Sequence, residues 1–208
     1  AKDVEPKAKQ LYAKAIAAQQ AGELKAARDS FRAAWKVQRH YKIAANLGSV
    51  ENELGEYRQA AVHLDEAIAL YKRDAKQDGG VDKSKLDALQ QIRKEATRHV
   101  ASFSALASFD GQVVPDGELL VDGESLGKLE LGRVYYLLPG ERTVSVRATG
   151  VASSPQVVMA AENVAGQFDI ALWADGPGRQ PARGAEEPTS LGLALGITAA
   201  AVAVPAVI

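Results

Sequence analysis

The residue types that most often carry catalysis or metal binding are sparse in this chain and lack the spacing that such chemistry needs. The sequence has no cysteine, which excludes a thiol nucleophile, a disulfide scaffold and a zinc ribbon. None of its three histidines, His40, His63 and His99, belongs to a metal-binding pattern such as HExxH. No P-loop or dinucleotide-binding glycine motif occurs. We therefore expect a protein that is not an enzyme and that needs no cofactor or metal ion.

A basic stripe is the most regular pattern of charged residues in the first half of the chain. Basic residues recur there at three- and four-residue intervals: Arg28, Arg32, Lys36, Arg39 and Lys42. On a helix, this spacing gathers side chains on one side, where they could bind an acidic peptide or a phosphorylated protein. A solvated helix face would show the same pattern, so both interpretations stay open.

Aromatic residues of the second half offer a different binding surface. Tyr135, Tyr136 and Trp173 could form a platform for a glycan or a cell-wall chain. They could equally belong to a thin hydrophobic core. Because adjacent side chains of a strand point to opposite faces, only one of the two tyrosines would point outward.

The two halves of the chain differ in composition and therefore in the secondary structure that they predict. Over all 208 residues, 25 Lys+Arg nearly balance 26 Asp+Glu, which excludes the concentrated basic surface of a nucleic-acid-binding protein. Residues 1–100 contain 19 basic and 14 acidic residues and are rich in helix-forming Ala, Lys, Gln and Leu. Residues 101–208 contain 6 and 12 and are rich in Gly, Val, Ser and Pro. We expect a two-domain protein of the α + β class.

The helical half contains an internal repeat with an offset of 33 residues, from Gly22 to Gly55. Small and large apolar residues recur at matching positions: Ala15, Gly22, Ala27, Phe31 and Ala34 in the first copy, and Leu47, Gly48, Gly55, Ala60, Leu64 and Ala67 in the second. This pattern resembles the tetratricopeptide repeat over about residues 8–74. The pattern is not complete: Glu51 and Ala18 stand where the repeat prefers tyrosine, Ala44 and Leu11 stand where it prefers tryptophan, and neither copy ends in the usual proline.

The resemblance implies antiparallel helix pairs that bind a partner protein through a concave surface. A further helical pattern runs from Leu86 to Val100, with Asp82 or Ser84 as its N-cap. This helix would cover the apolar face that two repeats leave open. We predict four repeat helices and a long capping fifth helix within residues 1–104.

The apolar period changes from 3.6 to 2 in the second half of the chain. Residues 143–148 and 167–172 alternate, and turn signals such as Asp122-Gly123 and Pro139-Gly140 separate the short strands. These features predict a small all-β sandwich of about six or seven strands over residues 105–174. The runs Leu120–Gly127 and Leu138–Val146 resemble the bacterial PEGA domain, and this resemblance implies a fold rather than a reaction.

The last residues have the composition of a linker followed by a membrane segment. Residues 175–189 are rich in Gly, Pro and charged residues, which predicts a flexible linker. The 18 residues from Leu191 to Ile208 carry no charge, and a helix of that length nearly crosses a hydrocarbon core of about 30 Å. We expect a transmembrane helix at 190–208, with a packed or disordered apolar terminus as the alternative. Because the chain begins at Ala1 rather than Met, we also expect that a signal peptide has been removed.

Together these features favour a non-enzymatic scaffold protein of the bacterial cell envelope. The repeats would bind a partner protein, the sandwich would act as a spacer or second module, and the tail would anchor both to a membrane after export. In the alternative, the sandwich binds a cell-wall glycan and the helices only support it. A cytoplasmic regulatory protein anchored by the same tail is a third hypothesis.

Overall fold

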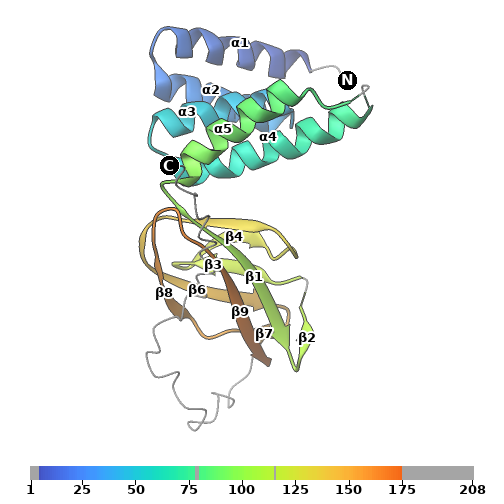
Figure 1. The fold of residues 1–208 in the computed structure, drawn as a ribbon, viewed down its shortest axis with the longest axis vertical. Helices are drawn as coiled ribbons and strands as arrows, with labels where there is room; N and C mark the ends of the chain where they lie inside the picture. Colours follow the sequence, from blue (N-terminus) through green and yellow to red (C-terminus); the bar gives the residue numbers. More distant parts are fainter. Residues whose placement is uncertain (1–4, 78–79, 115, 175–208) are drawn as a thin grey trace, which may run out of the picture.

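The computed structural model describes residues 5–77, 80–114 and 116–174, in which five helices precede a β-rich part (Figure 1). The helices are α1 (Pro6–Gln20), α2 (Leu24–Val37), α3 (Tyr41–Glu53), α4 (Tyr57–Gln77) and α5 (Lys83–Thr97). They lie at one end of the molecule and the strands lie at the other. The predicted organisation, a helical part followed by an all-β part, is confirmed.

Two helical hairpins, α1–α2 and α3–α4, reverse direction through the same backbone turn. Gly22 and Gly55 adopt φ angles of +77° and +76°, a left-handed conformation that is costly for other residues. At each turn, the N–H of the following glutamate donates to the carbonyl oxygen five residues earlier, at 2.9 Å in the first hairpin and 2.8 Å in the second. These hydrogen bonds recur with the offset of the sequence repeat, so the two hairpins are structural repeats.

Small residues allow the two helices of each hairpin to pack closely. A Cβ atom on Gly48 would lie 2.7 Å from Cγ of Leu64 and 3.1 Å from the carbonyl oxygen of Ala60. A side chain at this position would therefore push α3 and α4 apart. In the first hairpin, Ala15 and Ala27 are fully buried at the matching positions.

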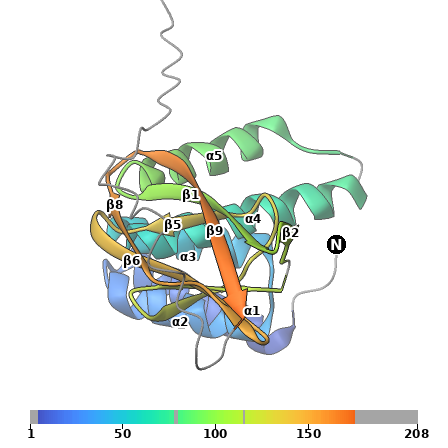
Figure 2. The same cartoon turned by 90° about the horizontal axis from the view of Figure 1, so that it is seen from below.

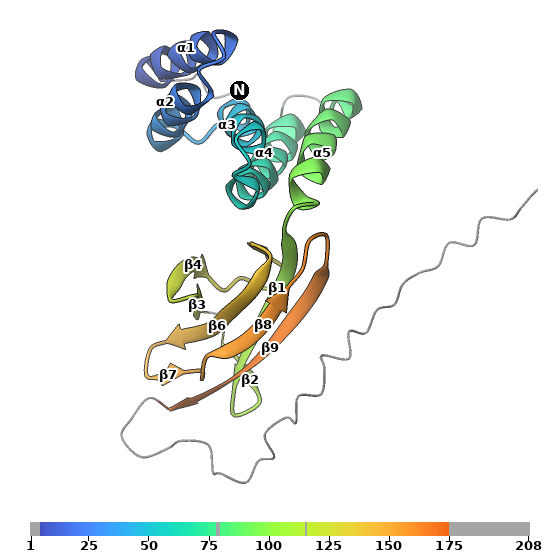
Figure 3. The ribbon, with the colours of Figure 1, turned by 90° about the vertical axis from the view of Figure 1, so that its left-hand side faces the viewer.

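The fifth helix packs against the second hairpin. Of the two expected caps, Asp82 is the N-cap, and its Oδ1 accepts hydrogen bonds from the N–H groups of Ser84 at 2.9 Å and Lys85 at 3.3 Å. Leu89 of α5 is buried in the same hydrophobic cluster as Leu47 of α3. Figure 3 shows α1, α3 and α5 along one side of the helical part, and α2 and α4 along the other.

The described residues contain nine strands, more than the six or seven predicted, because several strands are only two to five residues long. The strands are β1 (Ala101–Phe109), β2 (Gln112–Val113), β3 (Glu118–Val121), β4 (Glu124–Lys128), β5 (Val134–Leu137), β6 (Gly140–Ala148), β7 (Val151–Ala152), β8 (Gln156–Ala160) and β9 (Ala165–Ala174). In one sheet, β2 and β5 pair with β1, whose other neighbour is β9. In the second sheet, β3 lies between β4 and β6, and β6 also pairs with β7 and with β8. The strand β7 also pairs with β9 and so joins the sheets.

The core of the β-rich part lies between the two sheets. Phe103 of β1 and Phe168 of β9 stack there with their ring centroids 4.3 Å apart. Gly166 leaves room for this stack, because a Cβ atom at that position would lie 2.7 Å from the Phe103 ring. The opposite sheet contributes buried aliphatic side chains: Leu119, Val121, Val144 and Val146. The alternation predicted for residues 143–148 and 167–172 places every second side chain in this core.

The predicted linker at 175–189 and the predicted transmembrane helix at 190–208 lie outside the described residues. Within the described ranges, no helix combines the length and the apolar character needed to cross a membrane. The β-rich part begins at Ala101 rather than at residue 105, because only three residues separate α5 from β1.

Candidate functional site

Arg28 and Arg32 of the predicted basic stripe lie between the two hairpins. The guanidinium of Arg28 pairs with Glu56, which directly precedes α4. The guanidinium of Arg32 pairs with Glu51 and Glu56, at 2.8 Å each. These contacts join α2 to the end of α3 and the turn that follows it. The two arginines therefore stabilise the stacking of the hairpins, and their charges are balanced inside the helical part.

The other three residues of the stripe lie near the end of α2 and the start of α3. Arg39 forms an ion pair with Glu66 at 3.4 Å, and its guanidinium lies 4.2 Å from the centroid of the Trp35 ring. Lys36 and Lys42 are exposed and have no ion pair within the described part of the chain. The stripe thus follows the contact between the hairpins, and only these two lysines lack an acidic partner there.

Glu51 is a fully buried carboxylate at the centre of this contact. It accepts hydrogen bonds from Arg32, and its Oε2 lies 2.6 Å from Nδ1 of His63. The His63 ring also packs edge-on against Trp35, with the ring centroids 6.0 Å apart. Burying a carboxylate lowers the stability of the fold unless the group is paired and hydrogen-bonded. The contacts of Glu51 with Arg32 and His63 offset this loss. The departure from the repeat pattern at Glu51 was the sequence signal for this network.

The helices α1, α3 and α5 lie along one side of the helical part (Figure 3), and polar residues of α1 and α3 contact each other. The amide of Asn46 donates to the hydroxyl of Tyr12 on α1 at 2.8 Å, and to the carbonyl oxygen of Lys42 at 2.8 Å. Burial raises the pKa of Tyr12, and the hydrogen bond from Asn46 opposes this shift. Lys42, Asn46 and Ser49 follow helical spacing, which places them on one side of α3. We refer to Tyr12, Lys42, Asn46 and Ser49, none of which is fully buried, as the α1–α3–α5 face.

The helical part meets the sandwich at three polar side chains that no spacing in the sequence indicates. The hydroxyl of Tyr136 on β5 donates to Oδ2 of Asp65 on α4 at 2.5 Å and accepts from Nη2 of Arg93 on α5 at 2.8 Å. Arg93 also forms an ion pair with Asp65. Burial raises the pKa of Tyr136, and the hydrogen bond to Asp65 raises it further. Asp65, Arg93 and Tyr136 are named the junction triad below.

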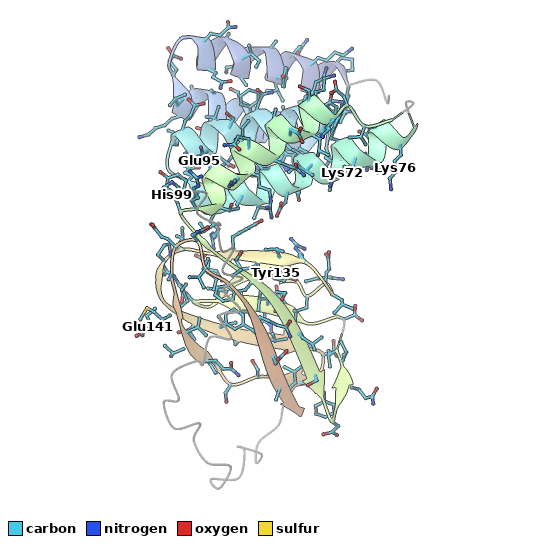
Figure 4. The ribbon with its side chains drawn as sticks, viewed as in Figure 1. Lys72, Lys76, Glu95, His99, Tyr135 and Glu141 are labelled. Atoms are coloured by element: carbon cyan, nitrogen blue, oxygen red, sulfur yellow. The ribbon has the colours of Figure 1, made fainter. Side chains whose placement is uncertain are left out.

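Aromatic and apolar contacts surround the junction triad. Tyr57 of α4 stacks on His99 with the ring centroids 3.9 Å apart, and His99 lies where the helical part joins the sandwich (Figure 4). Five further residues are fully buried with Tyr136 in one cluster: Ala60, Ala61, Leu64, Ala96 and Val100. When the molecule is seen from below, the strands lie in front of α2, α3 and α4 (Figure 2). The sandwich is therefore stacked against the helical part rather than held by the chain connection alone.

The predicted aromatic platform does not form from the two tyrosines. Tyr135 is 4% exposed and lies inside the sandwich (Figure 4), where its hydroxyl donates to the carbonyl oxygen of Lys128 at 2.7 Å. Tyr136 points out of the sandwich, as strand alternation requires, but it is only 2% exposed because α4 and α5 cover it. The side chain of Trp173 lies outside the described residues.

Residues 123–127 read Gly-Glu-Ser-Leu-Gly, which is the Gly-x-Ser-x-Gly pattern of serine hydrolases. The expectation that the chain is not an enzyme did not take this pattern into account. In those enzymes the serine occupies a sharp turn between a strand and a helix, beside a histidine. Here Ser125 lies within β4, and its hydroxyl donates to Oε1 of Glu118 at 2.5 Å. The motif therefore has neither the turn nor the base of a nucleophile elbow.

The histidines have structural contacts. Nδ1 of His40 accepts a hydrogen bond from the N–H of Lys42 at 3.2 Å at the start of α3, and burial lowers the pKa of this histidine. His63 contacts Glu51, and His99 stacks on Tyr57. In the residues that the structure describes, no group of three or more His, Cys, Asp or Glu side chains could hold a metal ion.

Comparison of the chain with protein-family models gives no match, and comparison with curated proteins likewise gives none.

Proposed function

We propose that this protein is a non-enzymatic interaction module that binds a partner protein through the α1–α3–α5 face. The observation that carries this proposal is the arrangement of polar residues on α3. Asn46 is held in place by its hydrogen bond to Tyr12, and Lys42 has no acidic partner in the described residues. These side chains are not part of the hydrophobic core, because the buried residues of α3 lie on its opposite side.

The chemistry of this face favours an acidic or polar segment of the partner. An exposed lysine attracts carboxylates and mainly raises the rate of association, an effect that salt screens. The amide of Asn46 and the hydroxyls of Tyr12 and Ser49 can form hydrogen bonds with a peptide backbone or side chain. Arg28 and Arg32 are assigned a structural role instead, because a partner would have to compete with Glu51 and Glu56 for them.

The proposal is tested by charge reversal and bulk on this face in the full chain. The variants are Lys42→Glu and Ser49→Arg, and the control is Lys72→Glu, an exposed residue of α4 (Figure 4). Protein captured by each immobilised variant is quantified against the unmodified chain at two salt concentrations. We expect a loss of about tenfold or more for the two face variants and no change for the control. Equal capture by all variants would contradict the proposal.

The location in the cell envelope and the membrane anchor belong to the same proposal and rest on the sequence of residues 190–208. In that arrangement the sandwich is a spacer between the anchor and the helical part. Two buried tyrosines give no support to the alternative in which the sandwich binds a glycan. Protease treatment of intact and of opened cells tests the location, because exported domains are cut once the outer barrier is removed.

A further inference from the structure

A small pocket lies between the helical part and the sandwich. It is lined by Arg58 of α4 and by six sandwich residues: Val121, Asp122, Glu124, Leu137, Leu138 and Arg142. Its volume is about 200 Å³, below the range of about 300–1,000 Å³ typical of pockets for drug-sized ligands. The size of this junction pocket suits a ligand comparable to a free amino acid.

The side of the pocket formed by the sandwich is held rigidly by Arg142. Its Nε donates to the carbonyl oxygen of Leu138 at 2.9 Å, and its Nη2 donates to that of Pro139 at 2.7 Å. Its Nη1 donates to Oδ2 of Asp122 at 3.2 Å, while Oδ1 of Asp122 accepts from the N–H of Thr143 at 2.8 Å. These hydrogen bonds fix the loop between β5 and β6 against the turn between β3 and β4. Arg142 and Asp122 therefore form the sandwich side of the pocket, and their charges are paired with each other.

Two other charged side chains line the pocket and have no hydrogen-bond or ion-pair partner in the described residues. Arg58 is half-buried, and within the described residues it forms no hydrogen bond or ion pair. Its charge nevertheless acts on Asp122, whose carboxyl has a pKa lowered first by the N–H of Thr143, then by Arg142 and also by Arg58. Glu124 is exposed and likewise has no partner in the described part of the chain. Arg58 and Glu124 thus face one cavity with opposite charges and do not pair with each other.

The remaining lining is apolar. Val121 and Leu137 are 5% and 2% exposed and belong to the packed sandwich, whereas Leu138 is 42% exposed. An exposed leucine beside two buried aliphatic residues gives a ligand an apolar surface to contact. The pocket therefore combines an unpaired guanidinium with an aliphatic wall.

We propose that the junction pocket binds a small aliphatic carboxylate, whose carboxylate pairs with Arg58 and whose aliphatic body packs on Val121 and Leu138. A guanidinium is well suited to this role, because it can donate two parallel hydrogen bonds to a carboxylate. Two kinds of molecule share this chemistry: a free aliphatic amino acid and a short fatty acid. Glu124 distinguishes them, because it can pair with the ammonium group that only the amino acid carries. The site is separate from the α1–α3–α5 face, so it does not depend on the proposed function.

The proposal is tested by titrating the isotope-labelled full chain with three probes and following its amide resonances by NMR. The probes are L-leucine, 4-methylpentanoate, which lacks the ammonium group, and L-leucinamide, which lacks the carboxylate. The variants are Arg58→Gln and Arg58→Lys, with Arg73→Gln as control, an exposed arginine of α4 whose partner is the adjacent Asp74. Because Arg58 has no hydrogen bond in the described residues, its replacement should leave the fold intact, and circular dichroism checks this.

We expect saturable shifts at Val121 and Leu138 with at least one of the two carboxylates, and binding of leucinamide that is weaker by about tenfold or more. Arg58→Gln should weaken binding by about tenfold or more, Arg58→Lys should weaken it less, and Arg73→Gln should leave it unchanged. The proposal is overturned if neither carboxylate gives a saturable shift, if leucinamide binds as well as the tighter of the two carboxylates, or if Arg58→Gln binds normally. With Glu124→Gln, weaker binding of leucine alone identifies an amino acid as the ligand, and unchanged binding of both carboxylates identifies a fatty acid.

Discussion

The junction triad predicts that a single hydroxyl group contributes measurably to the stability of the whole chain. Tyr136→Phe removes one oxygen atom and leaves the aromatic ring in its buried position. That oxygen donates to Asp65 and accepts from Arg93, two charged partners on different helices. The change therefore tests whether polar contacts, as well as apolar packing, hold the sandwich against the helical part.

The size of the effect follows from the exposure of the two partners. A hydrogen bond to a charged group typically contributes about 1.5–3 kcal/mol. The side chains of Asp65 and Arg93 are 36% and 34% exposed, and their ion pair persists without the hydroxyl, so water replaces part of the loss. We expect the free energy of unfolding to fall by about 1–2 kcal/mol.

Equilibrium unfolding in urea, followed by circular dichroism, measures this loss. Tyr57→Phe is the matched control, because Tyr57 lies at the same junction and its hydroxyl has no hydrogen bond in the described residues. The control should stay within about 0.5 kcal/mol of the unmodified chain. If Tyr136→Phe and Tyr57→Phe unfold at the same urea concentration, the reasoning about the triad is refuted.

The raised pKa of Tyr136 gives the same residue a second, independent readout. Its folded-state pKa lies above the ordinary value of 10.0, so the hydroxyl keeps its proton in the folded chain after it would ionise in the unfolded chain. The contribution of the hydroxyl to stability is therefore fully present below pH 10 and is lost as the pH rises above that value. Between pH 8 and about pH 11, the unmodified chain should lose more stability than Tyr136→Phe. Parallel losses would contradict the assignment.

Three further predictions concern the helical part, and each is measured by thermal or urea unfolding. Gly48→Ala should destabilise by about 1–3 kcal/mol, because its Cβ would lie 2.7 Å from Leu64, and a higher melting temperature would contradict the close packing of α3 on α4. Glu51→Ala should cost about 1–3 kcal/mol, because it removes the buried acceptor of Arg32 and His63 while Arg32 keeps its ion pair with Glu56, and a cost below about 0.5 kcal/mol would show that the network is dispensable. Asp82→Ala should cost about 1 kcal/mol through loss of the α5 cap, and no change would refute the capping role.

Most of the helical part could be predicted, because the sequence signals for helices and turns come from residues that are close together in the chain. The positions of Gly22 and Gly55 indicate where the chain reverses, and the 33-residue offset indicates that both hairpins fold alike. The pairing of strands was less predictable. Alternation shows which side chains face the core but does not show which strand lies beside which, so the parallel pairing of β1 with β9 was not foreseen. Strands of two residues, such as β2, also leave no periodic signal.

The candidate sites depended on contacts between residues that are distant in sequence. Tyr136 and Asp65 are 71 residues apart, and no spacing rule relates them. The basic stripe was recognised from helical spacing, but spacing does not show that Glu51 and Glu56 would approach Arg32 from the next hairpin. The junction pocket has the same origin, since Arg58 meets the sandwich residues only after the two parts are stacked.

Binding of a partner protein to the α1–α3–α5 face is tested most directly by site-specific photo-crosslinking. A photoreactive amino acid is placed at Ser49 on this face, at Lys72 on α4, or at Glu141 on β6, which projects from the sandwich (Figure 4). We expect a crosslinked partner from position 49 only, and loss of that product when Lys42→Glu is added. A partner that crosslinks from position 141 or 72 and not from position 49 would contradict it.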